Sequence, residues 1–303
     1  MATLQIQALG RVRVSCGETP LHFPATKVCD LLVFLLLRAG ETLRRDWIAE
    51  RLWPMHPPGR ARRSLSTALW RLRQVLAVGD AAGSPYIHAD RERISLTLTA
   101  SHTFDVALFE QQAAAGLEGP LPLDPPRLRA LEEALVLYRG DFLESCYDDW
   151  CLVERERLQL LLLRLLKRLQ RNARLCGAYD QAISYGQRLV GLDPLQEEVH
   201  RELMRCYAEA GQRSMALTQF QRCLETLRRE LQVEPMPETW RLYRRIRGER
   251  PASEAAAGAG HSAIQSALGQ FRRALDALES AWQSLQAVAS EFVEPNDPAV
   301  IPE

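Results

Sequence analysis

The stretch GRARRSLSTALWRLRQVL, residues 59–76, combines a high positive charge with a helical repeat of leucines. Five of its eighteen residues are arginine, and no Asp or Glu occurs from Arg51 to Gly79, although the whole chain is formally neutral. On a helix that turns by about 100° per residue, one narrow stripe carries Leu65, Leu69, Leu72 and Leu76. The pattern predicts a helix that packs through its leucines and turns its arginines outward.

The opposite face of this predicted helix is suited to a nucleic acid. It collects Arg60, Arg63, Thr67, Trp70, Arg71 and Gln74. A carboxylate on this face would repel phosphate, whereas each arginine displaces counterions from DNA. An α-helix also fits the major groove, where Arg and Gln hydrogen-bond to base edges. We therefore predict a DNA-reading helix; a solvated basic face without a function is the alternative.

The sequence on either side of this helix predicts a small α+β domain. In chain order, the expected elements are two strands in 4–14 separated near Gly10, a short strand at 21–23, helices at about 25–39 and 44–53, and a hairpin at 86–98. With the basic helix third among the helices, this order is that of a winged helix. The third helix of that fold enters the groove, and the wing, here with Arg91 and Arg93, contacts the DNA backbone.

From about residue 104 the chain is predicted to be helical. Helical segments are expected at 104–115, 127–139, 150–176, 178–191, 195–210, 213–231 and 238–247. GAYDQAI (177–183) and GQRSMAL (211–217) align at an offset of 34 residues, the period of tetratricopeptide repeats. We therefore expect stacked antiparallel helix pairs, whose grooves either bind proteins and peptides or serve as a scaffold or dimer surface.

The C-terminal region is predicted to be a linker followed by one amphipathic helix. Residues 251–260, PASEAAAGAG, have the composition of a linker. Beyond them, apolar residues step alternately by four and three in an unbroken heptad, whose central members are Leu268, Phe271, Leu275, Leu278, Trp282 and Leu285. A helix with this pattern needs a partner, so it either associates with its copy in a second chain or folds back on the helical domain.

Composition and missing motifs narrow the function. Residues 1–100 carry 14 Lys and Arg against 8 Asp and Glu, which favours a polyanionic partner for this part of the chain. No nucleotide-binding or hydrolase motif occurs and the six histidines lack ligand spacing, so we expect no enzyme, no metal site and no cofactor. Seven cysteines without a CxxC, no signal peptide and no apolar run long enough for a bilayer predict a cytoplasmic protein without a membrane partner.

Two long parts of the sequence resemble a known family. LQIQALGRVRV and the stretch from ATKVCDLLVFLLL to LWRLRQVL (25–76) resemble the OmpR-like winged helix of the SARP family of bacterial transcription activators. FDVALFE (104–110), LEEALVLYRGDFL (131–143) and the run 193–238 resemble the bacterial transcriptional activator domain of that family. The resemblance covers about residues 1–250.

The resemblance implies a promoter-binding activator that occupies direct repeats as a homodimer and contacts the sigma or alpha subunit of RNA polymerase. It assigns base reading to helix 60–76 and wing contacts to Arg91 and Arg93. It assigns polymerase contact to the connection that holds Trp53, Met55 and His56. The sequence departs from the family at the wing tip, where Asp90-Arg91-Glu92-Arg93 replaces a frequent Gly-x-Gly-Tyr. It also departs at Trp70, where the family more often has a small or basic residue.

We therefore predict a mainly α chain with a small α+β domain. The expected parts are a winged helix-turn-helix domain at 1–100, a tetratricopeptide-like activator domain at 101–250, a linker at 251–260, a heptad-patterned amphipathic helix at 261–293, and a tail at 294–303. Two other functions stay open. One is a protein-interaction adaptor whose basic face docks an acidic protein, and the other is a regulator that senses a small molecule bound in the helical stack.

Overall fold

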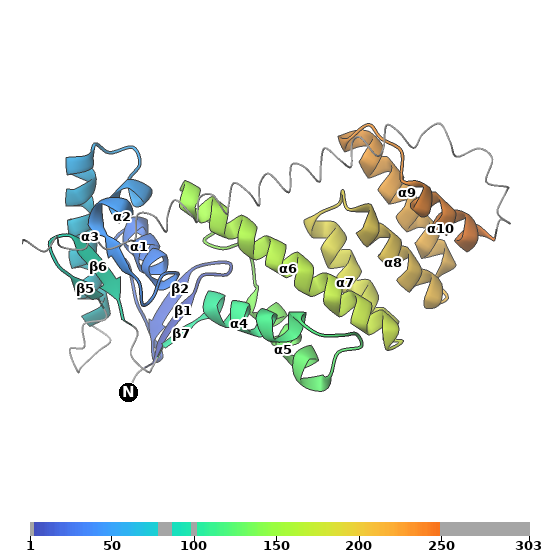
Figure 1. The fold of residues 1–303 in the computed structure, drawn as a ribbon, viewed down its shortest axis with the longest axis horizontal. Coiled ribbons are helices and arrows are strands. Elements are labelled where there is room, and N and C mark those ends of the chain that lie inside the picture. Colours follow the sequence, from blue (N-terminus) through green and yellow to red (C-terminus); the bar gives the residue numbers. More distant parts are fainter. Residues whose placement is uncertain (1–2, 78–86, 98–101, 249–303) are drawn as a thin grey trace, which may run out of the picture. The chain divides into compact units, whose positions relative to one another are not determined.

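The computed structural model describes residues 3–77, 87–97 and 102–248, and the chain divides into two compact units, Met1–Ala216 and Leu217–Glu303. The first unit holds two small sheets and helices α1 to α8 (Figure 1). For the described residues the predicted fold class is confirmed, because a winged helix precedes a series of packed helices. The heptad-patterned segment 261–293 lies outside the described residues. No helix among the described residues is long and apolar enough to cross a membrane.

The N-terminal sheet has the strand order β3-β2-β1-β7. Its strands are β1 (Leu4–Gln7), β2 (Arg13–Cys16), β3 (Thr19–Pro20) and β7 (His102–Phe104). β1 and β2 are antiparallel, as expected for strands that flank Gly10. The predicted strand at 21–23 is wrong. Pairing ends at β3 and the chain then turns into the first helix, so that only the Leu21 amide still donates to Val14 O of β2, at 2.8 Å.

Three helices and a second sheet complete the winged helix. The helices are α1 (Thr26–Leu36), α2 (Arg45–Leu52) and α3 (Pro58–Ala77), and the sheet has the order β4-β6-β5, with β4 (Thr42–Arg44), β5 (Ile87–Ala89) and β6 (Arg93–Leu96). The hairpin predicted at 86–98 is confirmed as β5 and β6, while β4 was not expected. Every residue from Leu31 to Leu36 is at most 5% exposed, so α1 is buried on nearly all sides.

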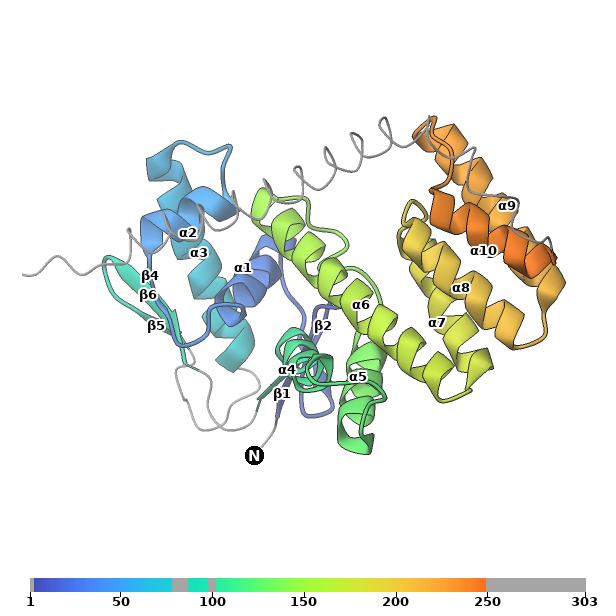
Figure 2. The same cartoon turned by 45° about the vertical axis from the view of Figure 1, so that its right-hand side comes forward.

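The helical part of the first unit begins directly after β7. Its helices are α4 (Asp105–Leu117), α5 (Pro125–Leu137), α6 (Asp149–Leu175), α7 (Tyr179–Leu192) and α8 (Glu197–Glu209). α4 packs on α5, and α7 packs on both α6 and α8, as the two views in Figures 1 and 2 show. These helices confirm the predicted segments, with ends that shift by a few residues.

The predicted repeat is visible in the backbone. Gly177 and Gly211, which lie 34 positions apart, have φ values of +73° and +76° and follow the ends of α6 and α8. After each glycine, the next amide donates back to a carbonyl five residues earlier: Ala178 N to Ala173 O and Gln212 N to Tyr207 O, both at 2.8 Å. This is the Schellman cap, which favours glycine because the left-handed conformation is strained for other residues.

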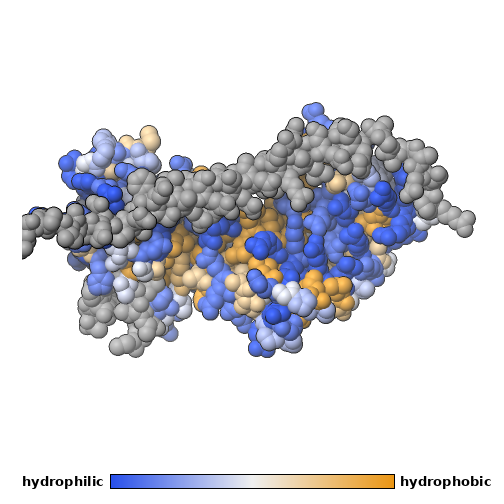
Figure 3. All heavy atoms as spheres, in the orientation of Figure 1, coloured by the Kyte–Doolittle hydropathy of each residue, from blue (hydrophilic) through white to orange (hydrophobic). Residues whose placement is uncertain are grey.

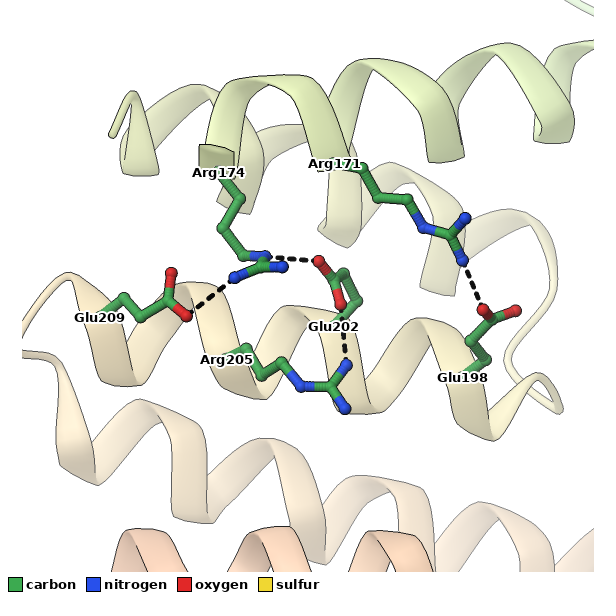
Figure 4. A network of polar contacts seen from close by, with 6 residues as sticks. All are labelled: Arg171, Arg174, Glu198, Glu202, Arg205 and Glu209. Carbon is green, nitrogen blue, oxygen red and sulfur yellow. Dashed lines mark hydrogen bonds and ion pairs between the residues drawn. The ribbon is translucent and has the colours of Figure 1, made fainter. Parts of the chain in front are cut away.

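Helices α6 and α8 are joined by a network of ion pairs (Figure 4). The Arg174 guanidinium lies 2.6 Å from Glu202 and 2.9 Å from Glu209, and Arg205 lies 2.8 Å from the other oxygen of Glu202. Arg171 pairs with Glu198 one helical turn away. Since Glu202 is only 8% exposed, its two arginines supply the charge compensation that a buried carboxylate requires.

The second unit contains most of α9 (Arg213–Glu230), which begins in the first unit, and all of α10 (Pro237–Arg247). Its two helices pack through aromatic rings. Phe220 stacks on Tyr243, with ring centroids 4.1 Å apart, and meets the edge of Trp240 at 4.7 Å. Phe220 is 1% exposed and therefore forms the centre of this small helix pair.

The winged helix and the helical stack are joined by buried hydrogen bonds. The Asp105 carboxylate, at the start of α4, accepts the amides of Ala8 and Leu9 at 2.8–3.0 Å. Gly10 N donates to Asp141 O at 3.0 Å, and the φ of Gly10 is +98°. A Cβ atom at position 10 would lie 3.3 Å from the amide nitrogen of Gly140, and the positive φ is strained for other residues, so glycine favours this close approach.

Apolar contacts and charges reinforce this junction. The Phe34 ring of α1 meets the edge of Trp150 of α6, with centroids 5.1 Å apart, and Lys27 of α1 forms an ion pair with Asp148. Beside this pair, Asp30 is 4% exposed. Burial raises the pKa of its carboxyl to about 6; Lys27 opposes this rise and Asp148 adds to it. One continuous apolar core therefore runs from the N-terminal sheet into α6.

Candidate nucleic-acid interface

The buried side of α3 is the leucine stripe that the sequence predicted. Leu65, Leu69, Leu72 and Leu76 are between 0% and 6% exposed, and Ala61 and Ala68 lie beside them. Their contacts with α1 and α2 fix the rotation of the helix about its own axis. The orientation of the outer face is therefore set by the core of the domain.

The outer side of α3 carries the predicted DNA-reading residues. All six are exposed: Arg60, Arg63, Thr67, Trp70, Arg71 and Gln74. The Trp70 residue is 61% exposed, so it does not pack into the domain. The Thr67 hydroxyl donates back to Arg63 O at 3.1 Å, which holds this side chain against its own helix.

The five arginines of the stretch fall into two groups. The Arg62 guanidinium forms two hydrogen bonds with Asp46 of α2, and Arg73 donates to Ile87 O of β5 at 3.4 Å. Both of these side chains therefore link α3 to its neighbours. Among the residues that the structure describes, Arg60, Arg63 and Arg71 form no ion pair, so their charges face outward uncompensated.

Arg45, which the sequence analysis did not single out, connects three elements of this site. Its backbone amide donates to Glu92 O at 2.8 Å, and its guanidinium donates to Asp90 O of the wing at 3.1 Å and to the Ser66 hydroxyl of α3 at 2.9 Å. The side chain thus sets the position of the wing relative to α3. Its partners are distant in sequence, and no local pattern marks it.

The wing tip is closed by an aspartate where the family often has glycine. Asp90 Oδ1 accepts the amides of Glu92 and Arg93, both at 2.7 Å, and these bonds hold the pKa of the Asp90 carboxyl below its usual value. Arg91 and Arg93 are exposed on this turn. The wing therefore presents two arginines and one exposed acid, Glu92, while the Asp90 carboxylate is used to form the turn.

The connection between α2 and α3 exposes one large apolar side chain. Met55 is 91% exposed, whereas Trp53 and His56 are half-buried. His56 Nδ1 lies 3.3 Å from the Ser64 hydroxyl of α3, which ties the connection to the following helix. The three residues predicted to contact polymerase therefore lie in one short segment, and Met55 is the most accessible of them.

The helical stack offers a surface and little internal space. Leu152, Val153 and Leu160 of α6 are 42%, 39% and 50% exposed, and Figure 3 shows hydrophobic atoms among hydrophilic ones over the helical part of the visible face. A cavity between α6 and α8, lined by Gln170 and Glu202 among others, holds only about 10 Å³. Ligand pockets span roughly 300–1,000 Å³. This cavity is therefore too small to hold a small-molecule ligand.

Comparison with known proteins finds one domain model and several regulators of transcription that are similar to this chain. Residues 104–247 match the family model described as Bacterial transcriptional activator domain. Over 263 residues, the chain is 27% identical to the transcriptional regulatory protein MoaR1 of Mycobacterium tuberculosis, an alignment that covers 83% of this chain and 81% of MoaR1. It is 30% identical to the regulatory protein AfsR of Streptomyces griseus over 84% of this chain but 26% of AfsR. Residues 104–247 therefore form a bacterial transcriptional activator domain, and the chain as a whole is similar to bacterial regulators of transcription.

A solved structure has the same fold as this chain. Mycobacterium tuberculosis EmbR, in complex with a low affinity phosphopeptide, aligns with a TM-score of 0.64 and 22% sequence identity over 91% of this chain and 72% of EmbR. The family model and the relatives are described as regulators of transcription. This agrees with the resemblance on which the sequence analysis relied.

Proposed function

We propose that this chain is a SARP-type, sequence-specific DNA-binding activator that inserts α3 into the major groove of promoter DNA. The observation that carries the proposal is the outer face of α3, where Arg60, Arg63 and Arg71 are exposed and form no ion pair with any described residue. Arginine in such a position hydrogen-bonds to guanine edges and to phosphates. Gln74 and Trp70 on the same face add an amide for base recognition and an apolar surface for stacking.

The wing supplies contacts to the DNA backbone in this proposal. Arg91 and Arg93 project from the turn that Asp90 closes, and Arg45 holds that turn at a defined position beside α3. Contacts to phosphate position a protein on DNA without selecting a sequence. Binding is therefore expected to weaken steeply with salt, since each neutralised phosphate releases counterions.

Recruitment of RNA polymerase is assigned to the connection between α2 and α3. Met55 is 91% exposed on it, beside Trp53 and His56, and an exposed methionine is an adaptable apolar contact for a protein partner. The exposed leucines of α6 offer a second surface of the same kind. In this proposal the protein acts in the bacterial cytoplasm, at promoters, on the sigma or alpha subunit of the polymerase.

Dimerisation is assigned to the heptad of segment 261–293, which lies outside the described residues. Leu275→Asp combined with Trp282→Asp places two charges on its apolar seam and is expected to convert a dimer into a monomer in sedimentation experiments. Ser284→Asp, off the seam, is the matched control. Two results together would show that the segment folds back instead: the wild-type protein is monomeric, and the helical stack is more sensitive to protease in the double variant.

The experiment that tests the proposed function is selection of DNA fragments from a random library by the purified full-length protein at about physiological salt. Enrichment of a short, directly repeated motif is expected, and the spacing of the repeats reports how two protomers sit on DNA. Equal retention of all sequences would contradict sequence-specific binding. Equal affinity for other polyanions would in addition favour an adaptor that docks an acidic protein.

A further inference from the structure

Three side chains with metal-binding atoms meet at the junction of the winged helix and the helical stack. They are Asp30 of α1, Cys146 of the connection between α5 and α6, and Asp148 at the start of α6, and their ligand atoms all lie within 4.8 Å of one another. Asp30 and Cys146 are each 4% exposed. The residues come from two distant parts of the sequence, so no spacing motif could have revealed them.

The Asp30 carboxylate is the observation that points to a ligand. Its residue is more than nine-tenths buried, yet it accepts no hydrogen bond from any described residue. Lys27 is the cation beside the cluster, and its ammonium group contacts Asp148 Oδ2. Two carboxylates therefore share one ammonium group in a partly buried place. One negative charge is left without compensation, so a further cation would stabilise this arrangement.

The donor atoms favour a particular class of cation. Carboxylate oxygens alone would suit Mg²⁺ or Ca²⁺, whereas a thiolate together with oxygens suits Zn²⁺ and related divalent transition metals. The Cys146 sulfur takes part in hydrogen bonds with the Asp148 amide and the Cys151 thiol. Ligands of a tetrahedral Zn²⁺ ion lie about 3.3–3.5 Å apart for Zn–O near 2.0 Å and Zn–S near 2.3 Å. The donor atoms here lie within 4.8 Å of one another, so binding such an ion would draw them closer together.

The surroundings of Asp148 also match a metal ligand. Its Oδ2 atom is held by Lys27 and by Trp150 Nε1, the latter at 3.2 Å. Its Oδ1 atom accepts no hydrogen bond within the described part of the chain. Partners that hold one oxygen of a ligating carboxylate orient the other oxygen toward the ion.

We propose that Asp30, Cys146 and Asp148 form a binding site for a divalent transition-metal ion of the Zn²⁺ class, with water as the fourth ligand. The ion links α1 of the winged helix to the start of α6. Because it binds only where the two parts are assembled, it stabilises the junction in proportion to its concentration. The site is independent of the proposed DNA-binding face on α3.

The test uses untagged full-length protein that has been stripped with a chelator and then titrated with Zn²⁺ or Co²⁺. We expect one ion per chain, a rise of the melting temperature with Zn²⁺, and a thiolate-to-metal charge-transfer band with Co²⁺. The proposal would be overturned if the titration showed neither a bound ion nor a shift in melting temperature. Lys27 and a proton on one carboxyl group would then compensate the charge of the cluster.

Variants separate metal binding from folding. Asp30→Asn removes one of the two carboxylate charges that share Lys27, so it is expected to raise the melting temperature of the metal-free protein while weakening Zn²⁺ binding by about 100-fold. Cys146→Ser should abolish the Co²⁺ charge-transfer band, and Cys176→Ser, an exposed cysteine, should leave it unchanged. If the Asp30 and Cys146 variants bind Zn²⁺ as wild type does, the assignment of these ligands is wrong.

Discussion

At the scale of single residues, identical side chains on one helix have different roles because their neighbours differ. Arg62 is neutralised by Asp46, whereas Arg63, the next residue, forms no ion pair in the described part of the chain. The helical wheel already separates Arg62 and Arg73 from the outer face, and the packing of α3 gives these two side chains their partners on α2 and β5. The charge that remains available for DNA is therefore smaller than the sequence count suggests, and it lies on one stripe.

The first prediction concerns this stripe. Arg63→Ala and Arg71→Ala should each weaken binding to the selected promoter motif by about 1–3 kcal/mol, since each removes a side chain positioned for base edges. Arg62→Ala removes the same charge from the same helix but from a side chain that Asp46 already holds, and a smaller loss is expected. Fluorescence anisotropy with labelled duplex measures all three. Equal losses for Arg62 and Arg71 would indicate that only net charge matters.

The second prediction concerns Trp70, which is 61% exposed. Because it makes little contact with the core, Trp70→Ala should change the free energy of unfolding by no more than about 0.5 kcal/mol while lowering DNA affinity. Urea denaturation and duplex titration measure the two effects. A clear loss of stability with unchanged DNA binding would show that the indole serves the domain and not the DNA.

At the scale of elements, short backbone motifs set where helices end and how they repeat. The Schellman caps at Gly177 and Gly211 end α6 and α8 at equivalent places, which gives successive helix pairs the same turn geometry. The turn at the wing tip is stabilised differently, by a side chain. The Asp90 carboxylate accepts hydrogen bonds from two backbone amides of the turn. Turns and helix ends of this kind can be predicted from the sequence where a residue with a special backbone preference, such as glycine or aspartate, marks the position.

The third prediction compares two glycines of the helical stack that differ in backbone conformation. Gly177→Ala should lower the free energy of unfolding by about 1–2 kcal/mol, because its φ of +73° is strained for alanine although its surroundings are open. Gly191→Ala is the control: this glycine lies within α7, also in open space, and alanine there should stabilise by up to about 1 kcal/mol. Chemical denaturation gives both values. If both substitutions changed the free energy of unfolding in the same direction, this explanation of the helix cap would be wrong.

At the scale of the whole molecule, the first unit behaves as one packed body in which the predicted DNA-binding domain rests on the helical stack. Asp105 accepts two amides of the N-terminal strand region, and Phe34 packs against Trp150 across the junction. The core passes through this junction without interruption. Buried contacts, and not a loose tether, therefore connect the helical stack to the winged helix.

The fourth prediction tests this coupling. Asp105→Ala leaves the buried amides of Ala8 and Leu9 without an acceptor, which should lower the free energy of unfolding by about 1–3 kcal/mol. Hydrogen exchange should then accelerate together at Ile6 in the sheet and at Leu165 in α6, since both lie in the shared core. Faster exchange confined to the N-terminal sheet would show that the two parts unfold independently.

Local sequence patterns were enough to predict the order of the helices, the buried and exposed sides of α3, and the 34-residue repeat. These properties depend on local periodicity and on residues with special backbone preferences, which neighbours in the chain already specify. The sequence did not reveal β4 and β7, because strands of three residues take their identity from distant partners. Nor did it show which arginines are paired, that Arg45 joins α2, α3 and the wing, or that Asp30 meets Cys146 and Asp148. Tertiary structure alone decided these contacts, since each one joins segments that only the folded core brings within reach.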